Sequence, residues 1–583
     1  MAATTHSPAV PGATAALATD PARAARVVVV GDGPLTIDDV VDVARHGARV
    51  RLADAAVEAM AASRAVVEGL ADDDRPHYGV STGFGALARR HIPVERRAQL
   101  QLSLVRSHAA GSGPEVEREV VRALQLLRLA TLATGRTGAR PVVAQTYAAM
   151  LDAGITPVVR EFGSLGCSGD LAPLAHVALA ALGEGEVRDA TGALAPAADA
   201  LAAAGISPLA LREKEGLALI NGTDGMLGML ALALHDLRSL LTTADVAAAA
   251  SVEALLGSDA PFAADLIALR PHPGQAASAA NLRALLDGSP VVASHRTLDA
   301  EGRPECTRVQ DAYSLRCAPQ VHGAARDTLD HAAAVARREL AAAIDNPVVT
   351  VDGRVESNGN FHGAPVAYVL DFLAIVAADV ASMSERRTDR FLDKARNEGL
   401  PPFLADDPGV DSGLMIAQYT AAGIVSELKR LAVPSSVDSI PSSAMQEDHV
   451  SMGWAGARKL RRAVDGLARV LAIELLTATR ALDLRCTPDL SAPARAPQRP
   501  DADNSSALES SAGSRAIPRP GADNLAGSLV PARGTGAVRD LVRTVVDGPG
   551  PDRYLSPDIE AVTHLVTTGA VAAAASGAVG YLA

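Results

Sequence analysis

Aromatic side chains are scarce in this chain: phenylalanine, tryptophan and tyrosine together make up only 3% of its 583 residues. Hydrophobic residues nevertheless reach 48%, and this content supports a sizeable core. A core with abundant alanine and leucine but few rings favours packed helices over a β-sandwich. We therefore predict a mainly α fold.

Cysteine is also rare. Four cysteines are scattered along the chain and none forms a Cys-x-x-Cys pair: Cys167, Cys306, Cys317 and Cys486. This spacing indicates neither a zinc site nor a disulfide framework. Because a protein without disulfides suits a reducing compartment, we predict a cytoplasmic protein that uses no metal.

The chain lacks signals for export and membrane insertion. No basic start followed by an uninterrupted apolar run occurs near the N-terminus. The most apolar long stretch, Ala364 to Met383, carries Asp371 and Asp379, whose charges are costly in a bilayer. The net charge of -13 opposes binding to nucleic acid, since acidic surfaces repel phosphates. We therefore predict a soluble protein with neither a membrane nor a nucleic-acid partner.

Composition and periodicity divide the chain into five parts. Residues 1–25 are rich in Ala, Thr and Pro, which predicts a disordered tail. Residues 26–223 combine a short strand, helices and Gly-rich loops, which predicts a smaller mixed region carrying the functional loops. Residues 224–486 predict a central bundle of long helices. Residues 487–535 are rich in Pro, Ser, Arg and Gly, which predicts a flexible insert, and residues 536–583 predict further helices.

The clearest helical pattern runs from about residue 447 to 484. Its apolar side chains recur at intervals of three and four, as they do on one face of an α-helix. Such a stripe must be covered by another element, so the region predicts an elongated bundle of long, nearly antiparallel helices. The stripe consists of Leu460, Val464, Leu467, Leu471, Leu475, Ala478 and Leu482.

The stretch from Gly163 to His176 reads Gly-Ser-Leu-Gly-Cys-Ser-Gly-Asp-Leu-Ala-Pro-Leu-Ala-His. Its glycines lack Cβ atoms and so let backbone atoms approach closely. If the nitrogen of Gly169 attacks the carbonyl carbon of Cys167, a five-membered ring closes. Loss of water from that ring and from the Ser168 hydroxyl then leaves an exocyclic methylidene. Such a group is an electrophile, which none of the twenty side chains supplies.

Other interpretations of this loop fit less well. A phosphate-binding loop ends in Gly-Lys-Ser/Thr, whereas here Gly169 precedes Asp170, whose charge repels phosphate. A nucleophile elbow needs Gly-x-Ser-x-Gly, and here the second glycine comes one place early. A Gly-rich turn capped by serine and aspartate before a short helix is the purely structural alternative.

The loop closely resembles the signature of the aromatic amino acid lyase family, which comprises lyases of histidine, phenylalanine and tyrosine and related aminomutases. Two further stretches follow the family's motifs in order: His77–Gly85 resembles its Tyr-Gly-x-Asn/Ser-Thr-Gly-Phe-Gly loop, and Lys214–Thr223 resembles its Glu-Gly-Leu-Ala-Leu-Ile/Leu-Asn-Gly-Thr run. Matching polar loops occur at Val309–Gln320 and Asn358–Gly363. The resemblance covers residues 26 to about 575, except for the insert.

The resemblance implies a prosthetic group and a set of site residues. In the family the central tripeptide cyclises into 4-methylidene-imidazol-5-one, so Cys167, Ser168 and Gly169 would form it with no external cofactor. Cys167 replaces the usual alanine but contributes only its carbonyl carbon to the ring closure. The resemblance implies catalytic roles for Tyr78, as the base, and for Tyr313. It implies substrate contacts at Asn221, Gln310, Arg316 and Phe361.

Two positions imply that the substrate is histidine. The pair Ser107-His108 has the form found in family members that act on histidine, whereas other members resemble His-Leu or Phe-Leu there. Glu427 lies where a glutamate of those members contacts the imidazole, and a carboxylate is a natural acceptor for an imidazole N–H. The Gln446–Met452 stretch also matches, although Met445 stands where many relatives have Asn. The implied reaction converts L-histidine to trans-urocanate and ammonia, the first step of histidine degradation.

Several alternatives share these motifs. A tyrosine or phenylalanine lyase, or an aminomutase that adds the ammonia back, would use the same framework, and product analysis separates them. A helical scaffold that has lost the ring would turn over no amino acid. Members of the family assemble as homotetramers whose active sites combine several subunits, and the resemblance implies the same assembly here.

Overall fold

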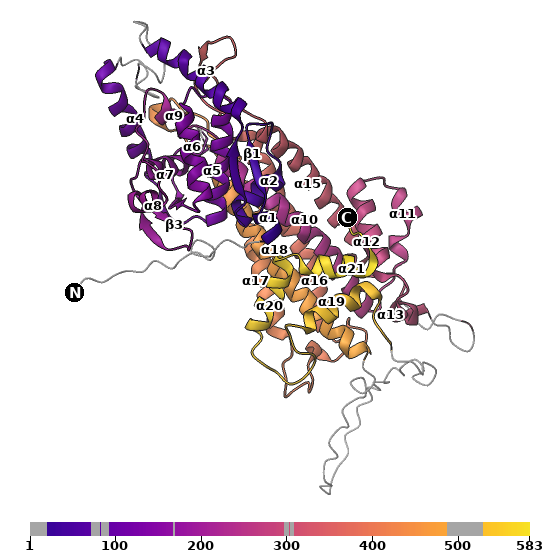
Figure 1. Cartoon of the computed structure of the whole chain (residues 1–583). Helices are drawn as coiled ribbons and strands as arrows, with labels where there is room; N and C mark the ends of the chain where they lie inside the picture. Colours follow the sequence, from indigo (N-terminus) through magenta and orange to yellow (C-terminus); the bar gives the residue numbers. More distant parts are fainter. Residues whose placement is uncertain are drawn as a thin grey trace, which may run out of the picture. The chain divides into compact units, whose positions relative to one another are not determined.

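Helices dominate the protein, and its strands are short (Figure 1). The structure, a computed structural model, describes residues 20–71, 82, 92–166, 169–296, 302, 308–486 and 529–583. The mainly α prediction is confirmed. The chain divides into two compact units, each made of three segments. The first unit contains Met1–Arg238, Thr328–Val376 and Lys429–Val464, and the second contains Ser239–Asp327, Ala377–Leu428 and Asp465–Ala583.

A parallel pair of strands opens the first unit. Strand β1 (Val27–Val30) pairs along its length with β2 (Arg49–Leu52). Between them, α2 (Ile37–Val41) starts at Thr36, whose side chain and backbone exchange hydrogen bonds with Asp39 in a capping box. The capping box satisfies backbone N–H groups that a helix start leaves unpaired. The short strand and the helices predicted for this region are confirmed.

The chain becomes ordered earlier than its composition predicted. We predicted a disordered tail through residue 25, but α1 (Pro21–Ala24) is a short helix capped by the Asp20 carboxylate. Beside it, Arg23 and Arg26 form ion pairs with the buried carboxylate of Asp42. These long-range pairs tether a segment that composition alone marks as unstructured. The rest of the predicted tail, residues 1–19, lies outside the described residues.

The rest of the N-terminal region packs around α5 (Arg118–Ala133), in which nearly every residue is buried. Short antiparallel strand pairings accompany these helices, as expected for the smaller mixed region. The helices are α3 (Asp54–Ala71), α4 (Val94–His108), α6 (Pro141–Asp152), α7 (Ala172–Ala181), α8 (Ala197–Ala203) and α9 (Glu215–Ala218). The paired strands are β3 (Ser112–Glu115) with β5 (Arg160–Phe162), and β4 (Thr156–Pro157) with β6 (Glu186–Arg188) and β7 (Leu194–Pro196).

Five helices contribute residues to both units: α10 (Asp224–Ala254), α15 (Ala318–Leu340), α16 (Ala364–Leu392), α17 (Met415–Leu431) and α18 (Gly453–Cys486). The apolar stripe predicted between residues 447 and 484 lies on α18, and none of its seven side chains is more than 6% exposed. The stripe is therefore core, as its spacing predicted. In the first unit a short hairpin of β8 (Val348–Val349) and β9 (Val355–Glu356) precedes α16.

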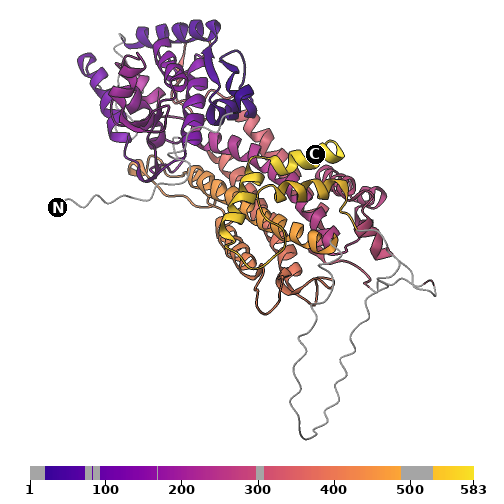
Figure 2. The ribbon, with the colours of Figure 1, turned by 60° about the horizontal axis from the view of Figure 1, so that its bottom comes forward.

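The second unit is helical apart from its loops. Its α19 (Arg533–Arg543) packs against α12 (Pro273–Leu286) and α21 (Ala570–Val579), so segments far apart in sequence lie side by side (Figure 2). Arg387 and Glu474 form a fully buried ion pair in this unit, with N···O distances of 2.5 and 2.9 Å. The other helices are α11 (Ala264–Ala268), α13 (Pro290–Ala293), α14 (Tyr313–Arg316) and α20 (Ser556–Thr567).

The predicted insert ends earlier than its composition indicated. Residues 487–528 lie outside the described residues, but α19 begins at Arg533, within the range assigned to the insert. The buried Glu253 carboxylate accepts hydrogen bonds from the backbone N–H of Ala532, at 2.7 Å, and from the Thr535 hydroxyl. These contacts fix the point at which the chain rejoins the second unit.

Helix α16 is the one helix of the described residues that is long and apolar enough by itself to cross a membrane, and α20 with α21 reaches that length only as a bent pair. The most apolar window of α16 has a mean hydropathy of 1.9, yet 61% of that window is buried inside the protein. Within the first unit, the buried Asp371 on this helix accepts hydrogen bonds from Lys459 Nζ, at 2.6 Å, and from the Ser436 backbone, at 2.8 Å. These features are those of a core helix.

Candidate active site

The loop predicted to carry the prosthetic group is held against the start of α10. Cys167 and Ser168 lie outside the described residues, but Gly169 forms a parallel bridge with Gly222, and the Asp170 N–H donates to the Gly222 carbonyl at 2.7 Å. Gly169 has φ +78°, and a Cβ there would lie 1.9 Å from the Gly222 oxygen. Only glycine fits such a backbone contact.

The other end of the loop is held by a different segment of the first unit. The Ser451 hydroxyl donates to the Gly166 carbonyl at 3.0 Å, and the Met452 N–H donates to the Leu165 carbonyl at 2.9 Å. Gly166 has φ +69°, and a Cβ there would meet the Ser451 oxygen at 2.2 Å. The described residues on either side of Cys167 and Ser168 are thus held by other segments, with glycine where atoms crowd most.

Asp170 couples this loop to the N-terminus of α10. Its carboxylate is fully buried and accepts a hydrogen bond from the Gly225 N–H at 2.5 Å. Burial raises the pKa of Asp170 well above its usual range, and the charge of Asp224 acts in the same direction. The helix N-terminus partly compensates, because its N–H groups favour a negative group.

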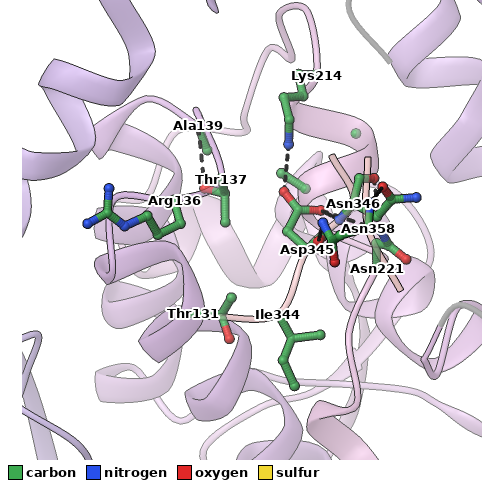
Figure 3. Close-up of polar contacts among 12 residues, drawn as sticks. Thr131, Arg136, Thr137, Ala139, Lys214, Asn221, Ile344, Asp345, Asn346 and Asn358 are labelled. Atoms are coloured by element: carbon green, nitrogen blue, oxygen red, sulfur yellow. Dashed lines mark hydrogen bonds and ion pairs between the residues drawn. The ribbon is translucent and has the colours of Figure 1, made fainter. Parts of the chain in front are cut away.

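A buried polar network fixes Asn221 (Figure 3). Lys214 Nζ lies 2.6 Å from an oxygen of Asp345, and both side chains are completely buried. Asn221 Nδ2 donates to the Asn346 carbonyl at 3.0 Å, and Asn358 Nδ2 donates to the Asp345 carbonyl at 3.0 Å. Burial lowers the pKa of Lys214, although the Asp345 charge opposes this. The network therefore fixes both the backbone and the amide around Asn221.

One atom of this network has no partner. Asn221 Oδ1 is buried and accepts no hydrogen bond from any residue that the structure describes. Arg128 meanwhile donates to the Asn221 carbonyl at 2.8 Å, so the backbone is fixed independently of the amide. A buried acceptor without a donor is costly unless a ligand or another group supplies one. This oxygen is therefore a candidate ligand contact.

Ser107 and His108 form the last turn of α4. His108 Nδ1 and the Ser107 hydroxyl both lie within hydrogen-bond distance of the Leu104 carbonyl, at 2.9 and 3.0 Å. Because a carbonyl only accepts, Nδ1 of His108 donates, which makes Nε2 the acceptor of the neutral ring. Burial lowers the pKa of His108, while the Leu104 carbonyl and the charge of Glu447 act in the opposite direction. His108 and Glu447 therefore interact electrostatically.

Phe361 lies half-buried in the loop before α16. Asn358 orders this loop, because its Oδ1 accepts from the Asn360 N–H at 2.9 Å and its backbone N–H donates to Asn346 Oδ1 at 3.0 Å. The next residue, His362, stacks on His449 with ring centroids 5.4 Å apart. The structure thus places the Phe361 loop and the Gln446–Met452 stretch in contact.

Four further predicted site residues belong to the second unit: Gln310, Tyr313, Arg316 and Glu427. Tyr313 and Arg316 are the first and last residues of the short helix α14. The Arg316 guanidinium lies over the Tyr313 ring, 4.7 Å from its centre. Tyr313 is 70% exposed, and Gln310 and Glu427 are exposed as well. Glu427 lies on α17, and Tyr78 lies outside the described residues. Among the described residues, no cluster of His, Cys, Asp and Glu side chains could hold a metal ion.

The carboxylate whose charge acts on His108 in the first unit is Glu447, which the sequence analysis assigned no role. The Gln446–Met452 stretch had matched the family, but the contact with the substrate imidazole was assigned to Glu427, and that assignment stays a prediction. Periodicity cannot tell which of two glutamates approaches a histidine more than 300 residues away. The His362–His449 stack brings the stretch containing Glu447 next to the Phe361 loop. This proximity, which the sequence does not contain, is what marks Glu447 as a candidate site residue.

Comparison with known proteins agrees with these features. The sequence pattern described as aromatic amino acid lyase matches residues 35–500. A protein of Streptomyces griseus named histidine ammonia-lyase is 61% identical over 557 residues, which cover 95% of this chain and 99% of that protein. One of the same name from Gloeobacter violaceus is 46% identical over 94% of this chain and 97% of its own length.

Solved structures with the same fold include a tyrosine aminomutase from Streptomyces globisporus, with a TM-score of 0.83 and 36% identity. The match covers 95% of this chain and 100% of that one. A histidine ammonia-lyase from Trypanosoma cruzi has a TM-score of 0.79, 36% identity, and coverage of 95% and 96%. The clamped glycine loop, the ordered motifs and these similarities agree over nearly the full length. The chain belongs to the aromatic amino acid lyase family.

Proposed function

We propose that this protein is a histidine ammonia-lyase, which eliminates ammonia from L-histidine to give trans-urocanate. The Gln446–Met452 stretch, which includes Glu447 and contacts both the Phe361 loop and the predicted prosthetic-group loop, carries this proposal. Nε2 of His108 and the Glu447 carboxylate are both hydrogen-bond acceptors, and an imidazole offers N–H donors that a phenyl ring lacks. The 61% identity to the Streptomyces griseus histidine ammonia-lyase over nearly the whole chain supports the same substrate.

We propose that Cys167, Ser168 and Gly169 form 4-methylidene-imidazol-5-one without an external cofactor. The positive φ of Gly169 and its contact with Gly222 support this, since both bring backbone atoms unusually close. Once formed, the group supplies the electrophile that the side chains lack. The contacts of Ser451 with Gly166 hold the loop in place from the other side.

We propose that side chains of the family motifs, contributed by more than one subunit, bind and orient the substrate. The unpaired Oδ1 of Asn221 is placed to accept a hydrogen bond from the substrate amine. Arg316 offers two parallel N–H donors to the substrate carboxylate. Tyr78, the residue implied by the family motif, takes the β-proton on its phenol oxygen. Contacts from Tyr313, Gln310 and Phe361 complete the set.

We propose that the protein works as a homotetramer in the cytoplasm, with active sites shared between subunits. Gln310, Tyr313 and Glu427 are exposed in the chain alone, as expected for residues completed by another subunit. In the first unit, α16 also exposes Tyr368, Phe372 and Ile375, which recur at helical spacing and are 51%, 45% and 46% exposed. A contiguous apolar face of this kind is suited to subunit contacts.

The test is direct. Purified protein is mixed with histidine, tyrosine or phenylalanine, and the ultraviolet absorbance of the acrylate products is followed. We expect urocanate from histidine and little product from the others, because a site with buried polar acceptors rejects ligands that leave them unpaired. Cinnamate, coumarate or a β-amino acid as the main product would assign the chain to a phenylalanine lyase, a tyrosine lyase or an aminomutase.

A second measurement tests the prosthetic group independently of substrate. The intact mass of the chain is expected to lie two water molecules below the sequence mass, and the unmodified mass in active protein would contradict ring formation. Glu447→Gln and Glu427→Gln form a matched pair, since each replaces one carboxylate by an amide of equal size. We expect the larger loss of histidine turnover from Glu447→Gln, and the reverse order would return the imidazole contact to Glu427.

A further inference from the structure

We propose that Ser442 is a positioning residue for histidine recognition, whose hydroxyl orients the Glu447 carboxylate toward the substrate imidazole. Ser442 Oγ donates to Glu447 Oε2 at 2.7 Å, and both side chains are half-buried. A hydroxyl that donates to a carboxylate makes a short, charge-assisted hydrogen bond. The inference rests on the proposed function, because it takes Glu447 as the imidazole acceptor.

The backbone brings Ser442 and Glu447 together as well. They form an isolated antiparallel bridge, in which the Ser442 N–H donates to the Glu447 carbonyl at 2.9 Å and the Glu447 N–H donates back at 3.3 Å. The turn between them contains Ser443, Ala444 and Met445 at φ +50°, +52° and +70°. Residues with a Cβ rarely adopt this region, and three in succession persist only where surrounding contacts impose the conformation. Such strain is common at binding sites.

The other side of Glu447 is anchored to the prosthetic loop. Ser451 donates to the Gly166 carbonyl at 3.0 Å, and the Met452 N–H donates to the Leu165 carbonyl at 2.9 Å. Glu447 therefore lies on a backbone segment fixed at both ends. A glutamate side chain still has three rotatable bonds, so a fixed backbone alone does not aim its carboxylate. The Ser442 hydroxyl supplies that constraint by holding Oε2.

The direction of this constraint matters because Glu447 also acts on His108. The negative charge of Glu447 opposes the lowering of the His108 pKa by burial. A carboxylate that rotated away would weaken both the interaction with His108 and the acceptor offered to the substrate. Ser442 thus acts on the substrate through Glu447 and is not itself a catalytic residue.

Steady-state kinetics of Ser442→Ala test the proposal, with the wild type first measured on histidine, tyrosine and phenylalanine. We expect KM for histidine to rise about tenfold with a smaller change in kcat, because the contact is made in both the ground state and the transition state. Residual turnover of phenylalanine, which has no imidazole, is expected to change little. Ser442→Thr keeps the hydroxyl and is expected to recover most of the lost affinity.

Binding provides a readout that does not depend on turnover. 3-(Imidazol-4-yl)propanoate keeps the imidazole and carboxylate of the substrate but lacks its amine, so its Kd reports ring recognition without reaction. We expect Ser442→Ala to weaken this binding about tenfold. Ser439→Ala is the matched control, because it removes a hydroxyl from the same segment that bonds to the Val450 backbone, not to Glu447. Its Kd is expected to stay near the wild-type value.

A double mutant separates positioning from a structural role. In a Glu447→Gln background, Ser442→Ala is expected to add little further loss, since it acts through the carboxylate already removed. The proposal is overturned if the two losses multiply, if Ser439→Ala weakens the probe as much as Ser442→Ala, or if Ser442→Thr behaves like Ser442→Ala. Failure of the proposed function would appear separately, as a wild type that does not turn over histidine.

Discussion

The candidate site residues of the two units are held in different ways. In the first unit, Asn221 is surrounded by a buried network in which Lys214 and Asp345 are completely shielded from water. In the second unit, Tyr313 is 70% exposed, and the stacked Arg316 beside it is half-buried. A buried polar network fixes the geometry of its members, and losing one member is energetically costly. Exposed side chains acquire a fixed geometry only on binding. The candidate site residues of the first unit are thus preorganised in the single chain, whereas Tyr313 and Arg316 of the second unit are not held by a buried network.

The largest expected effect comes from breaking a buried ion pair in each unit. Lys214→Met strands the Asp345 charge and Arg387→Met strands the Glu474 charge, so each is expected to lower the free energy of unfolding by about 3–5 kcal/mol. Only Lys214→Met is also expected to reduce formation of the prosthetic group, because Asp345 belongs to the network around Asn221. Denaturant unfolding and intact mass measure the two effects.

A control for this pair lies on the surface of the first unit. Arg354→Ala breaks ion pairs with Asp352 and Glu356 in which all partners are more than half exposed. Its cost is expected to be much smaller than that of either buried pair, since solvent screens such pairs. If Lys214→Met cost no more than Arg354→Ala, the first unit would not be preorganised by its buried network.

A large effect on activity with a small effect on stability is expected from Arg316→Ala in the second unit. Loss of an exposed stacking contact with Tyr313 costs roughly 0.5–1 kcal/mol of folding free energy. Loss of a bidentate partner for the substrate carboxylate is expected to lower kcat/KM by about a hundredfold or more. Arg316→Lys keeps the charge but not the two parallel N–H donors. Its kcat/KM should therefore lie between those of the wild type and Arg316→Ala. Equal losses of stability and activity would show that Arg316 is structural.

The units should also differ in their response to acid. Burial, with the charge of Arg160, lowers the pKa of His176, so the unfolded chain binds this proton more readily than the folded protein. The neutral His176 ring therefore contributes to the free energy of unfolding at neutral pH. This contribution is lost as pH falls below about 6.5. In the second unit, burial favours a higher pKa for Asp245, but Arg326 and His322 lower it overall. The contribution of the Asp245 carboxylate to the free energy of unfolding is lost only as pH falls below about 4.

Unfolding free energies measured between pH 7 and pH 5 test this difference. His176→Gln is expected to flatten the pH dependence by less than about 1 kcal/mol, because a half-buried ring is partly screened by solvent. Glutamine also keeps an acceptor for the Gly111 N–H, which His176 Nε2 accepts at 3.1 Å. His564→Gln, at an exposed site in the second unit, is the control and should leave the slope unchanged.

The smallest expected effect is a stabilisation. Met445 has φ +70°, a conformation that asparagine adopts more readily than other residues with a Cβ. Met445→Asn is therefore expected to raise the free energy of unfolding by about 0.5–1 kcal/mol. Met445→Ala removes the exposed side chain but keeps the strained backbone, so it should give no gain. A gain from alanine as large as that from asparagine would mean that strain at this position is unimportant.

Much of the fold and part of the site could be predicted from the sequence. The start of α2 at Thr36 and the buried stripe on α18 are local patterns, written in residues three or four positions apart. The order of α1 and the start of α19 were missed, because both depend on buried acids, Asp42 and Glu253, that lie far away in sequence. The roles of Tyr78, Ser168 and Glu427 stay predictions.

The sequence by itself determined a helical protein of the aromatic amino acid lyase family, since glycine spacing, helical periodicity and motif order are local properties of the chain. Only the tertiary structure decided that Lys214 meets Asp345, 131 residues away, and that Glu447 acts on His108. The size of an interaction between charges depends on distance and burial, which follow from the path of the whole chain. Neither quantity is encoded in the residues that flank a motif.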